Sequence, residues 1–157
     1  MVRRLDVTKI AVMGQSCGGV QAIQASADPR VTITVGWNTG LLPQPSPAME
    51  NIGKDALSRL HAPIAYFTGD KANDVAFPNA ADDFERITSV PVLFAWRDTL
   101  VHAGTYREAN GGELGRIAVA YLAWRLKGDV QAGRMFTGAM CGLCGDARWH
   151  VSKKRVD

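Results

Sequence analysis

The feature that most constrains the fold is a pentapeptide of the form G-x-S-x-G, which reads GQSCG at residues 14–18. An apolar run at residues 10–13 precedes it and predicts a buried strand, and residues 20–25 after it predict a helix. A serine on a sharp turn between a strand and a helix is the arrangement of a nucleophile elbow, which lifts the hydroxyl above the end of a sheet. We therefore predict Ser16 to be a nucleophile and the backbone N–H of Cys17 to face a developing oxyanion.

The two glycines of the pentapeptide have a steric interpretation. A serine held at a strained backbone angle needs small neighbours so that strand and helix can approach each other, and Gly14 and Gly18 flank it on both sides. The alternative is a glycine-rich turn at a helix N-terminus that holds a phosphate. The strand before the turn and the helix after it favour the elbow.

The rest of the chain alternates between apolar, β-branched runs and segments with helical spacing. Strands are predicted at residues 31–37, 64–67 and 91–96, and helices at residues 51–60, 79–87, 113–126 and 130–136. This alternation predicts an α/β protein with a mostly parallel sheet of about four strands flanked by helices, in a single domain over residues 1–157. A loop with three prolines at residues 41–48 is expected to overhang the site and shape its pocket.

A serine nucleophile needs a base within hydrogen-bond reach and a carboxylate that orients the base. In open parallel sheets, sites form at the carboxyl ends of the strands. His102 follows the predicted strand at 91–96, whereas His61 precedes a strand and His150 lies in the basic tail. We therefore predict His102 to be the base.

The carboxylate has two candidates in one loop, Asp70 and Asp74, both just after the predicted strand at 64–67. We prefer Asp74, because several residues are needed to reach from the strand end toward the histidine, and Asp70 is then expected to cap or brace the turn. Asp82 and Asp83 are interpreted as charges near the start of a helix, where the macrodipole favours them.

Several motifs are similar to those of the α/β-hydrolase superfamily, of the carboxylesterase and dienelactone-hydrolase-like type. The similar segments span nearly the whole chain: GQSCGG at 14–19, YFTGDKANDVA at 66–76, HAGTY at 102–106, WRLKGD at 124–129, and CGLC at 141–144 with Trp149. The resemblance implies Ser16 as nucleophile, Asp74 as acid, His102 as base and the Cys17 N–H in the oxyanion hole. The order Ser, Asp, His along the chain is that of the α/β-hydrolase fold.

The chain departs from that family in the position of the elbow. Family members have several strands before it, whereas in this sequence it begins at residue 14. It resembles an N-terminally truncated member that lacks the loop for a second oxyanion N–H. The elbow strand is then expected at a sheet edge, so we predict that a second copy covers it in a homodimer. The second oxyanion donor would come from that partner, from the Gln15 side chain, or be absent.

Two of the three cysteines, Cys141 and Cys144, form a C-x-x-C near the C-terminus. A zinc site would need two more ligands, and only His150 is near in sequence. A redox motif is expected to open a helix after a strand, whereas this one lies in a glycine-rich tail. We therefore interpret the pair as structural, either reduced or bridged, and predict no metal and no cofactor.

The composition narrows the remaining classes of partner. The net charge is only +3, and the cluster Lys153-Lys154-Arg155 is interpreted as a solvated terminus, so no nucleic-acid partner is expected. There is no apolar stretch of bilayer length and no signal-peptide pattern, so we expect no membrane partner and a cytoplasmic protein as written, although a longer parent could be secreted. The expected partner is a small-molecule ester.

The sequence thus predicts a serine esterase that cleaves short-chain esters through an acyl-enzyme. The alternative is a hydrolase-fold remnant with weak or no activity that serves as an interaction module, which the missing oxyanion loop favours.

Overall fold

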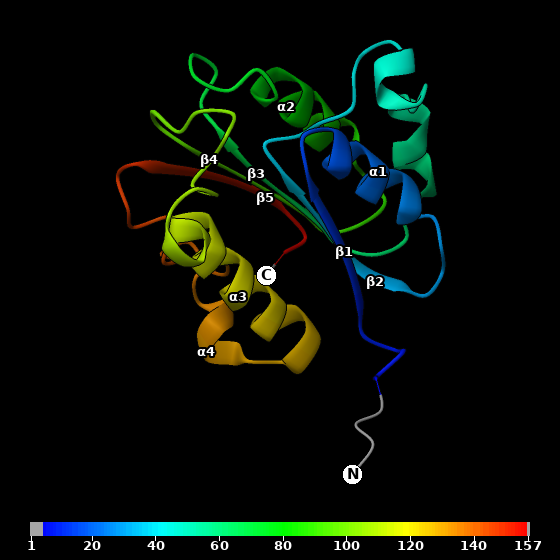
Figure 1. Cartoon of the computed structure of the whole chain (residues 1–157). Coiled ribbons are helices and arrows are strands. Elements are labelled where there is room, and N and C mark those ends of the chain that lie inside the picture. Colours follow the sequence, from blue (N-terminus) through cyan, green and yellow to red (C-terminus); the bar gives the residue numbers. More distant parts are fainter. Residues whose placement is uncertain (1–4, 157) are drawn as a thin grey trace.

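The strands form one sheet of five in which neighbours along the chain are also neighbours in space (Figure 1). This computed structural model describes residues 5–156. The strands are β1 (Ile10–Gln15), β2 (Val31–Trp37), β3 (Ile64–Gly69), β4 (Val92–Arg97) and β5 (Trp149–Lys154). The first four are parallel and β5 is antiparallel to β4. The predicted α/β class with a mostly parallel sheet is confirmed.

Helices cover both faces of this sheet, with α1 and α2 on one side and α3 and α4 on the other (Figure 1). The helices are α1 (Cys17–Ala25), α2 (Phe77–Arg86), α3 (Gly112–Lys127) and α4 (Val130–Gly133), and 3-10 turns occur at η1 (Pro47–Met49), η2 (Lys54–Arg59) and η3 (Ala109–Gly111). Right-handed crossovers that always step in the same direction place the connecting helices on the same face, which explains the position of α1 and α2. None of the helices within residues 5–156 combines the length and the apolar character that a bilayer crossing requires.

The core consists of two apolar layers separated by the sheet. One layer packs under α1, η2 and α2 and includes Ile23, Leu41, Ile64, Phe84 and Phe94. The other packs under α3 and α4 and includes Ile33, Phe67, Leu93, Ile117 and Phe136. All six residues of β3 are buried, as is typical of a central parallel strand covered on both faces.

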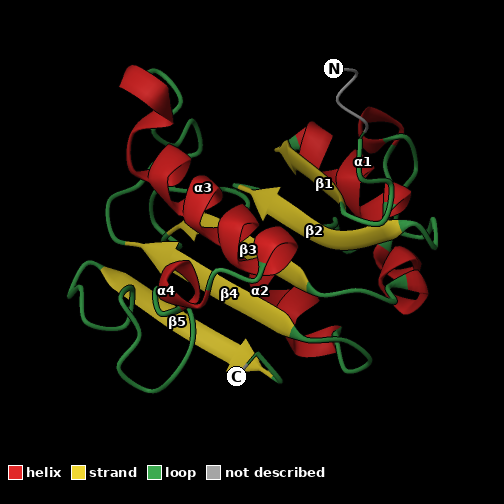
Figure 2. Ribbon diagram, turned by 90° about the horizontal axis from the view of Figure 1, so that it is seen from below, coloured by secondary structure: helices red, strands yellow, loops and turns green. Residues whose placement is uncertain are grey.

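The fifth strand corrects the prediction of about four strands and of a solvated basic tail. β5 pairs along β4 from Trp149 to Lys154, at the edge opposite β1 (Figure 2). The Lys154 ammonium bonds the carbonyl oxygens of Phe84 and Glu85 and lies over the Phe84 ring. The lysines at residues 153–154 therefore belong to an edge strand of the sheet, where lysine is common.

The segment predicted as a helix at residues 51–60 is also different. It forms the shorter 3-10 turn η2, which begins only at Lys54, because Asn51 has a left-handed φ of 57° that a continuous helix does not allow. The apolar side chains that gave the helical spacing are still buried: Ile52, Ala56, Leu57 and Leu60. The predicted spacing therefore found the buried face, and the type of helix was wrong.

Candidate active site

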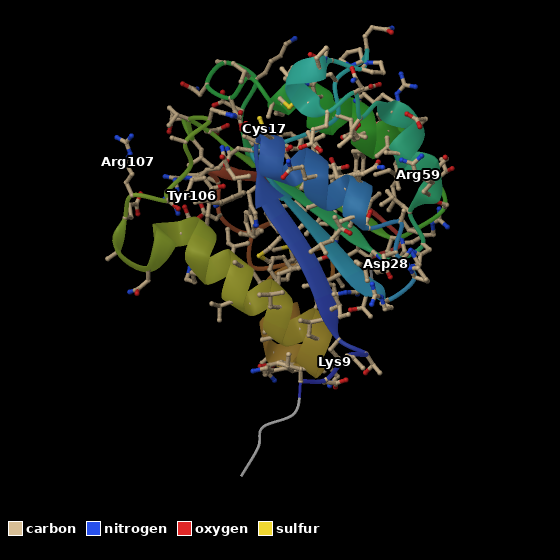
Figure 3. The ribbon with its side chains drawn as sticks, turned by 45° about the vertical axis from the view of Figure 1, so that its right-hand side comes forward. Lys9, Cys17, Asp28, Arg59, Tyr106 and Arg107 are labelled. Atoms are coloured by element: carbon tan, nitrogen blue, oxygen red, sulfur yellow. A yellow bond between two sulfur atoms is a disulfide. The ribbon has the colours of Figure 1, made fainter. Side chains whose placement is uncertain are left out.

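Ser16 lies between β1 and α1 in the strained geometry that an elbow requires. Its backbone angles are φ 52° and ψ −120°, outside the regions that L-residues favour. The Ser16 N–H donates to Trp37 O, and the Ser16 carbonyl accepts from Gly19 and Val20 N–H. The strand ladder and the first helical turn therefore fix the serine from both sides. Figure 3 shows the neighbouring Cys17 at one end of β1, with Lys9 at the other.

The glycines around Ser16 differ in what they do, which corrects part of the expectation. A Cβ on Gly14 would lie 2.1 Å from the Gly18 carbonyl oxygen, and one on Gly19 would lie 2.3 Å from Thr39 Cγ2. A Cβ on Gly18 would meet nothing within 4 Å. Close approach of β1 and α1 therefore requires glycine at 14, the Thr39 side chain after β2 requires glycine at 19, and the second glycine of the pentapeptide is not sterically required.

The three residues predicted to act together lie in one hydrogen-bonded chain. His102 Nε2 lies 3.0 Å from Ser16 Oγ, and His102 Nδ1 lies 2.7 Å from Asp74 Oδ1. They come from segments that follow β1, β3 and β4, at the carboxyl ends of three parallel strands. The imidazole can therefore accept a proton from the hydroxyl while its other nitrogen donates to the carboxylate.

The Asp74 carboxylate is held in a fully hydrogen-bonded, buried environment, with 1% of the residue exposed. Burial raises the pKa of this carboxyl, but hydrogen bonds from Ala76 N–H, the Asn38 amide, His102 and Gly69 N–H outweigh it and lower the pKa below its usual value. An ionised Asp74 is the form that can orient and stabilise a histidinium.

Asp70, the other candidate for the acid, points elsewhere. Its carboxylate accepts from Ala72 N–H, from Asn73 and, over a longer separation in sequence, from Thr99 N–H at 2.7 Å. These hydrogen bonds, with that of Thr99 first, lower the pKa of Asp70. Asp70 thus braces the turn after β3 and ties it to the loop that carries His102.

The first turn of α1 offers main-chain donors near the serine. Because Gly19 and Val20 N–H are bonded to Ser16 O, Cys17 and Gly18 N–H are left without a main-chain acceptor within residues 5–156. The Gln15 side chain, one of the sources considered for a second oxyanion donor, instead donates from Nε2 to the His102 carbonyl at 3.1 Å. Gln15 therefore links the elbow to the histidine loop.

Asn38 and Tyr106 also belong to this site, although neither was assigned a role there from the sequence, where Tyr106 was only placed within the HAGTY segment at 102–106. Asn38 follows β2 and is fully buried; its Nδ2 donates to Asp74 Oδ2 at 2.7 Å, and its Oδ1 accepts from Tyr106 OH at 3.0 Å. Figure 3 shows Tyr106 at the same end of the sheet as Cys17. The available signal was a polar residue directly after a buried strand, since strand ends are where sites form.

A cavity of about 220 Å³ opens beside Ser16 and His102. Its apolar lining comes from α1, the segment after β2 and the residues just before α2: Val20, Leu42, Met49, Val75 and Ala76. Asn38, Thr39 and Asn79 add polar groups. Leu42 belongs to the proline-containing loop, so that loop does line this cavity.

None of the three cysteines lines this cavity. Cys141 and Cys144 form a disulfide, which is the bridged form of the structural pair considered above. Cys17 has a free, exposed thiol. Within the described ranges, no three His, Cys, Asp or Glu side chains are grouped so that they could hold a metal ion.

No protein-family model matches this chain, and no curated protein matches it. What the chain does is therefore inferred from the geometry of its own site.

Proposed function

We propose that this protein is a serine hydrolase of the α/β-hydrolase type that cleaves short-chain carboxylic esters. The observation that carries the proposal is the hydrogen-bonded chain from Ser16 through His102 to Asp74, with the serine at φ 52°. A hydroxyl, an imidazole and a buried carboxylate in this order are what nucleophilic catalysis by serine needs.

In the first half of the reaction, Ser16 Oγ attacks the ester carbonyl carbon while His102 Nε2 takes the hydroxyl proton. The carbonyl π electrons move to oxygen, and the oxyanion accepts a hydrogen bond from Cys17 N–H at the positive end of α1. Asp74 stabilises the histidinium. The C–O bond to the alcohol then breaks, and the alcohol leaves with the proton from His102.

In the second half, a water molecule attacks the acyl-enzyme and gives its proton to His102. The second tetrahedral intermediate collapses, the bond to Ser16 Oγ breaks, and the proton returns from His102 to that oxygen. The carboxylic acid leaves and the serine is regenerated, so no cofactor enters the balance.

The size and lining of the cavity suit a substrate with a short, uncharged acyl or alcohol group. Its volume of about 220 Å³ and its lining by Val20, Leu42 and Met49 suit a few methylene groups, and apart from His102 no lining residue is ionisable. Long chains would extend past Val75, which is 76% exposed at the rim.

The test is hydrolysis of p-nitrophenyl acetate, butyrate and octanoate by purified protein, beside Ser16→Ala. We expect turnover that is highest for the short esters and falls by at least about a thousandfold in Ser16→Ala. Because the exposed Cys17 thiol could itself react with an activated ester, Cys17→Ala is the matched control and should retain turnover. A fluorophosphonate should add its mass to Ser16 and fail to do so in Ser16→Ala.

If the folded protein neither turns over these esters nor reacts with the fluorophosphonate, the proposal fails and the non-catalytic interaction module takes its place. The observation that favours this second candidate is that the main-chain donors found near Ser16, the N–H groups of Cys17 and Gly18, both belong to the first turn of α1. Losing one oxyanion donor costs roughly a hundred- to a thousandfold in rate.

A further inference from the structure

The loop that carries His102 is fastened by side chains from three successive strand ends. Gln15 at the end of β1 donates to the His102 carbonyl at 3.1 Å, and Asp70 after β3 accepts from Thr99 N–H at 2.7 Å. Between them, Asn38 after β2 contacts the loop at more than one point. Of the three side chains, only Asn38 also bonds Asp74, the acid of the proposed triad.

The orientation of the Asn38 amide follows from its neighbours. An ionised carboxylate only accepts hydrogen bonds, so the NH₂ group must face Asp74 Oδ2, at 2.7 Å. The same NH₂ group lies 3.4 Å from the Val101 carbonyl oxygen, and the amide oxygen accepts from Tyr106 OH. Both Val101 and Tyr106 belong to the histidine loop, so one amide joins the carboxylate to the loop of its histidine.

The backbone of Asn38 is shaped for this role. Its N–H donates to Phe67 O and so ends the β2–β3 ladder, and its φ of 43° turns the side chain into the protein interior. Asparagine tolerates this left-handed region better than most residues. The loop closes tightly over it, because a Cβ on Gly104 would lie 3.1 Å from Asn38 Oδ1.

We infer that Asn38 is a positioning residue that acts through Asp74 and holds the carboxylate and the His102 loop as one unit. This inference rests on the proposed function of the site. Asp74 Oδ1 already accepts from Ala76 N–H and His102, and Oδ2 from Gly69 N–H. The Asn38 amide supplies the fourth donor and is the one that couples the carboxylate to Tyr106.

Two substitutions separate positioning from packing. In Asn38→Asp, two carboxylates would lie at about the present distance of 2.7 Å and share a proton, because both cannot ionise there. While that proton is held, the new carboxyl can donate to Asp74 as the amide does. In Asn38→Gly, the left-handed backbone is unstrained and the side chain is lost.

We expect Asn38→Gly to lower kcat about ten- to a hundredfold at all pH values, with a smaller change in KM; this is the range known for groups that orient metal ligands, taken here for a group that orients a carboxylate. Asn38→Asp should keep activity at the acid end of the profile and lose it as pH rises. Asn110→Asp is the matched control, because Asn110 is exposed and also left-handed, with φ 55°. Tyr106→Phe should lower kcat by less than Asn38→Gly does.

A second readout does not depend on turnover. The chain has only three histidines, so the Nδ1–H resonance of His102 can be assigned by its loss in His102→Gln. We expect it to move in both Asn38 variants and to stay in place in Asn110→Asp. If the wild-type protein lacks esterase activity but this resonance moves, the positioning role stands and the proposed function fails. The inference would be overturned if both Asn38 variants kept the wild-type position of this resonance. Where turnover can be measured, their pH profiles of activity would then also match that of Asn110→Asp.

Discussion

His102 Nε2 lies 3.0 Å from Ser16 Oγ, although 86 residues separate the two along the chain. The contact arises because β1 and β4 run in the same direction in one sheet, so that both carboxyl ends reach the same edge. A parallel sheet thus brings together groups that are remote in sequence, and the residues just past the carboxyl end of each strand determine the chemistry that is possible there.

The two carboxylates of the loop after β3 can be told apart by substitution. We expect Asp74→Asn to lower kcat by about 10⁴-fold, because an amide in place of the carboxylate leaves the histidine in the wrong tautomer. Asp70→Asn should retain most of the activity and lose stability, since its bonds brace the turn and Thr99 N–H. Ester hydrolysis and thermal unfolding of both variants check this, and loss of turnover in Asp70→Asn alone would reverse the assignment.

The alternation of apolar runs and helical segments was sufficient to predict the α/β class and the first four strands. β5 was missed because an edge strand shows only a weak pattern: Trp149 and Val151 are its only apolar residues, and lysines follow. The helical spacing at 51–60 predicted the right buried residues, but the positive φ values of Glu50 and Asn51 keep the start of this segment out of a helix, which begins only at Lys54.

The chain order and the strand-end rule were sufficient to nominate Ser16, Asp74 and His102, which the fold brings together. Asn38 could not be nominated, because a buried asparagine becomes recognisable only when its carboxylate partner is in place. Asp83 was interpreted as a helix-start charge, whereas it lies in the seventh position of α2 and pairs with Lys54. That pairing depends on where η2 packs, which no local pattern encodes.

The glycines of the elbow predict a contrast between neighbouring positions. Gly14→Ala should destabilise the protein by more than about 3 kcal/mol, because its Cβ would meet main-chain atoms of Gly18 that cannot rotate away. Gly18→Ala should leave stability unchanged or raise it by up to about 1 kcal/mol, since alanine favours the helix. Urea unfolding measures both, and equal loss in the two variants would contradict the steric assignment.

The disulfide between Cys141 and Cys144 is expected to stabilise the fold and to leave the site unaffected. Cys141 is buried in the layer under α3 and α4, and neither cysteine lines the cavity at Ser16. A loop this short gives roughly 2 kcal/mol of stabilisation in the chain-entropy description. Reduction, or the double substitution to serine, should lower the free energy of unfolding by about that amount at unchanged kcat, and a loss of turnover without unfolding would contradict it.

The outer edge of β1 predicts self-association. Ser16 N–H donates to Trp37 O of β2. Along a strand, the main-chain N–H and C=O groups of successive residues point to opposite sides. Those of Ala11, Met13 and Gln15 therefore point away from β2, toward the open edge of the sheet. The Met13 side chain is 39% exposed at this edge. We propose that two copies pair antiparallel through β1, which closes both edges at once.

Light scattering after gel filtration should then give about twice 16.9 kDa. Met13→Pro removes an outward N–H without touching the β1–β2 ladder and should give a monomer, whereas Met13→Leu keeps the N–H and should remain dimeric. A wild-type mass equal to one chain would exclude this pairing.

The buried pair of Asp83 and Lys54 predicts an unusual dependence of stability on pH. Asp83 is fully buried; its Oδ1 lies 2.7 Å from Lys54 Nζ and its Oδ2 accepts from Leu41 N–H in the cavity-lining loop. Burial raises the pKa of this carboxyl to about 6, although Lys54 and the hydrogen bonds oppose the rise. The folded protein therefore holds this proton more tightly than the unfolded chain, whose carboxyl titrates near 3.8.

It follows that the contribution of Asp83 to the free energy of unfolding is complete below about pH 4 and is lost as pH rises through about 6. The free energy of unfolding of the wild type minus that of Asp83→Asn, measured with urea, should fall by on the order of 1–3 kcal/mol between pH 4.5 and 7.5. Asp82→Asn is the control on the same helix: Arg86 first and then Lys54 lower the pKa of Asp82, so its contribution changes only in stronger acid and the difference should stay flat. A flat or rising difference for Asp83→Asn would mean that Lys54 keeps the carboxylate ionised in the folded protein throughout this range.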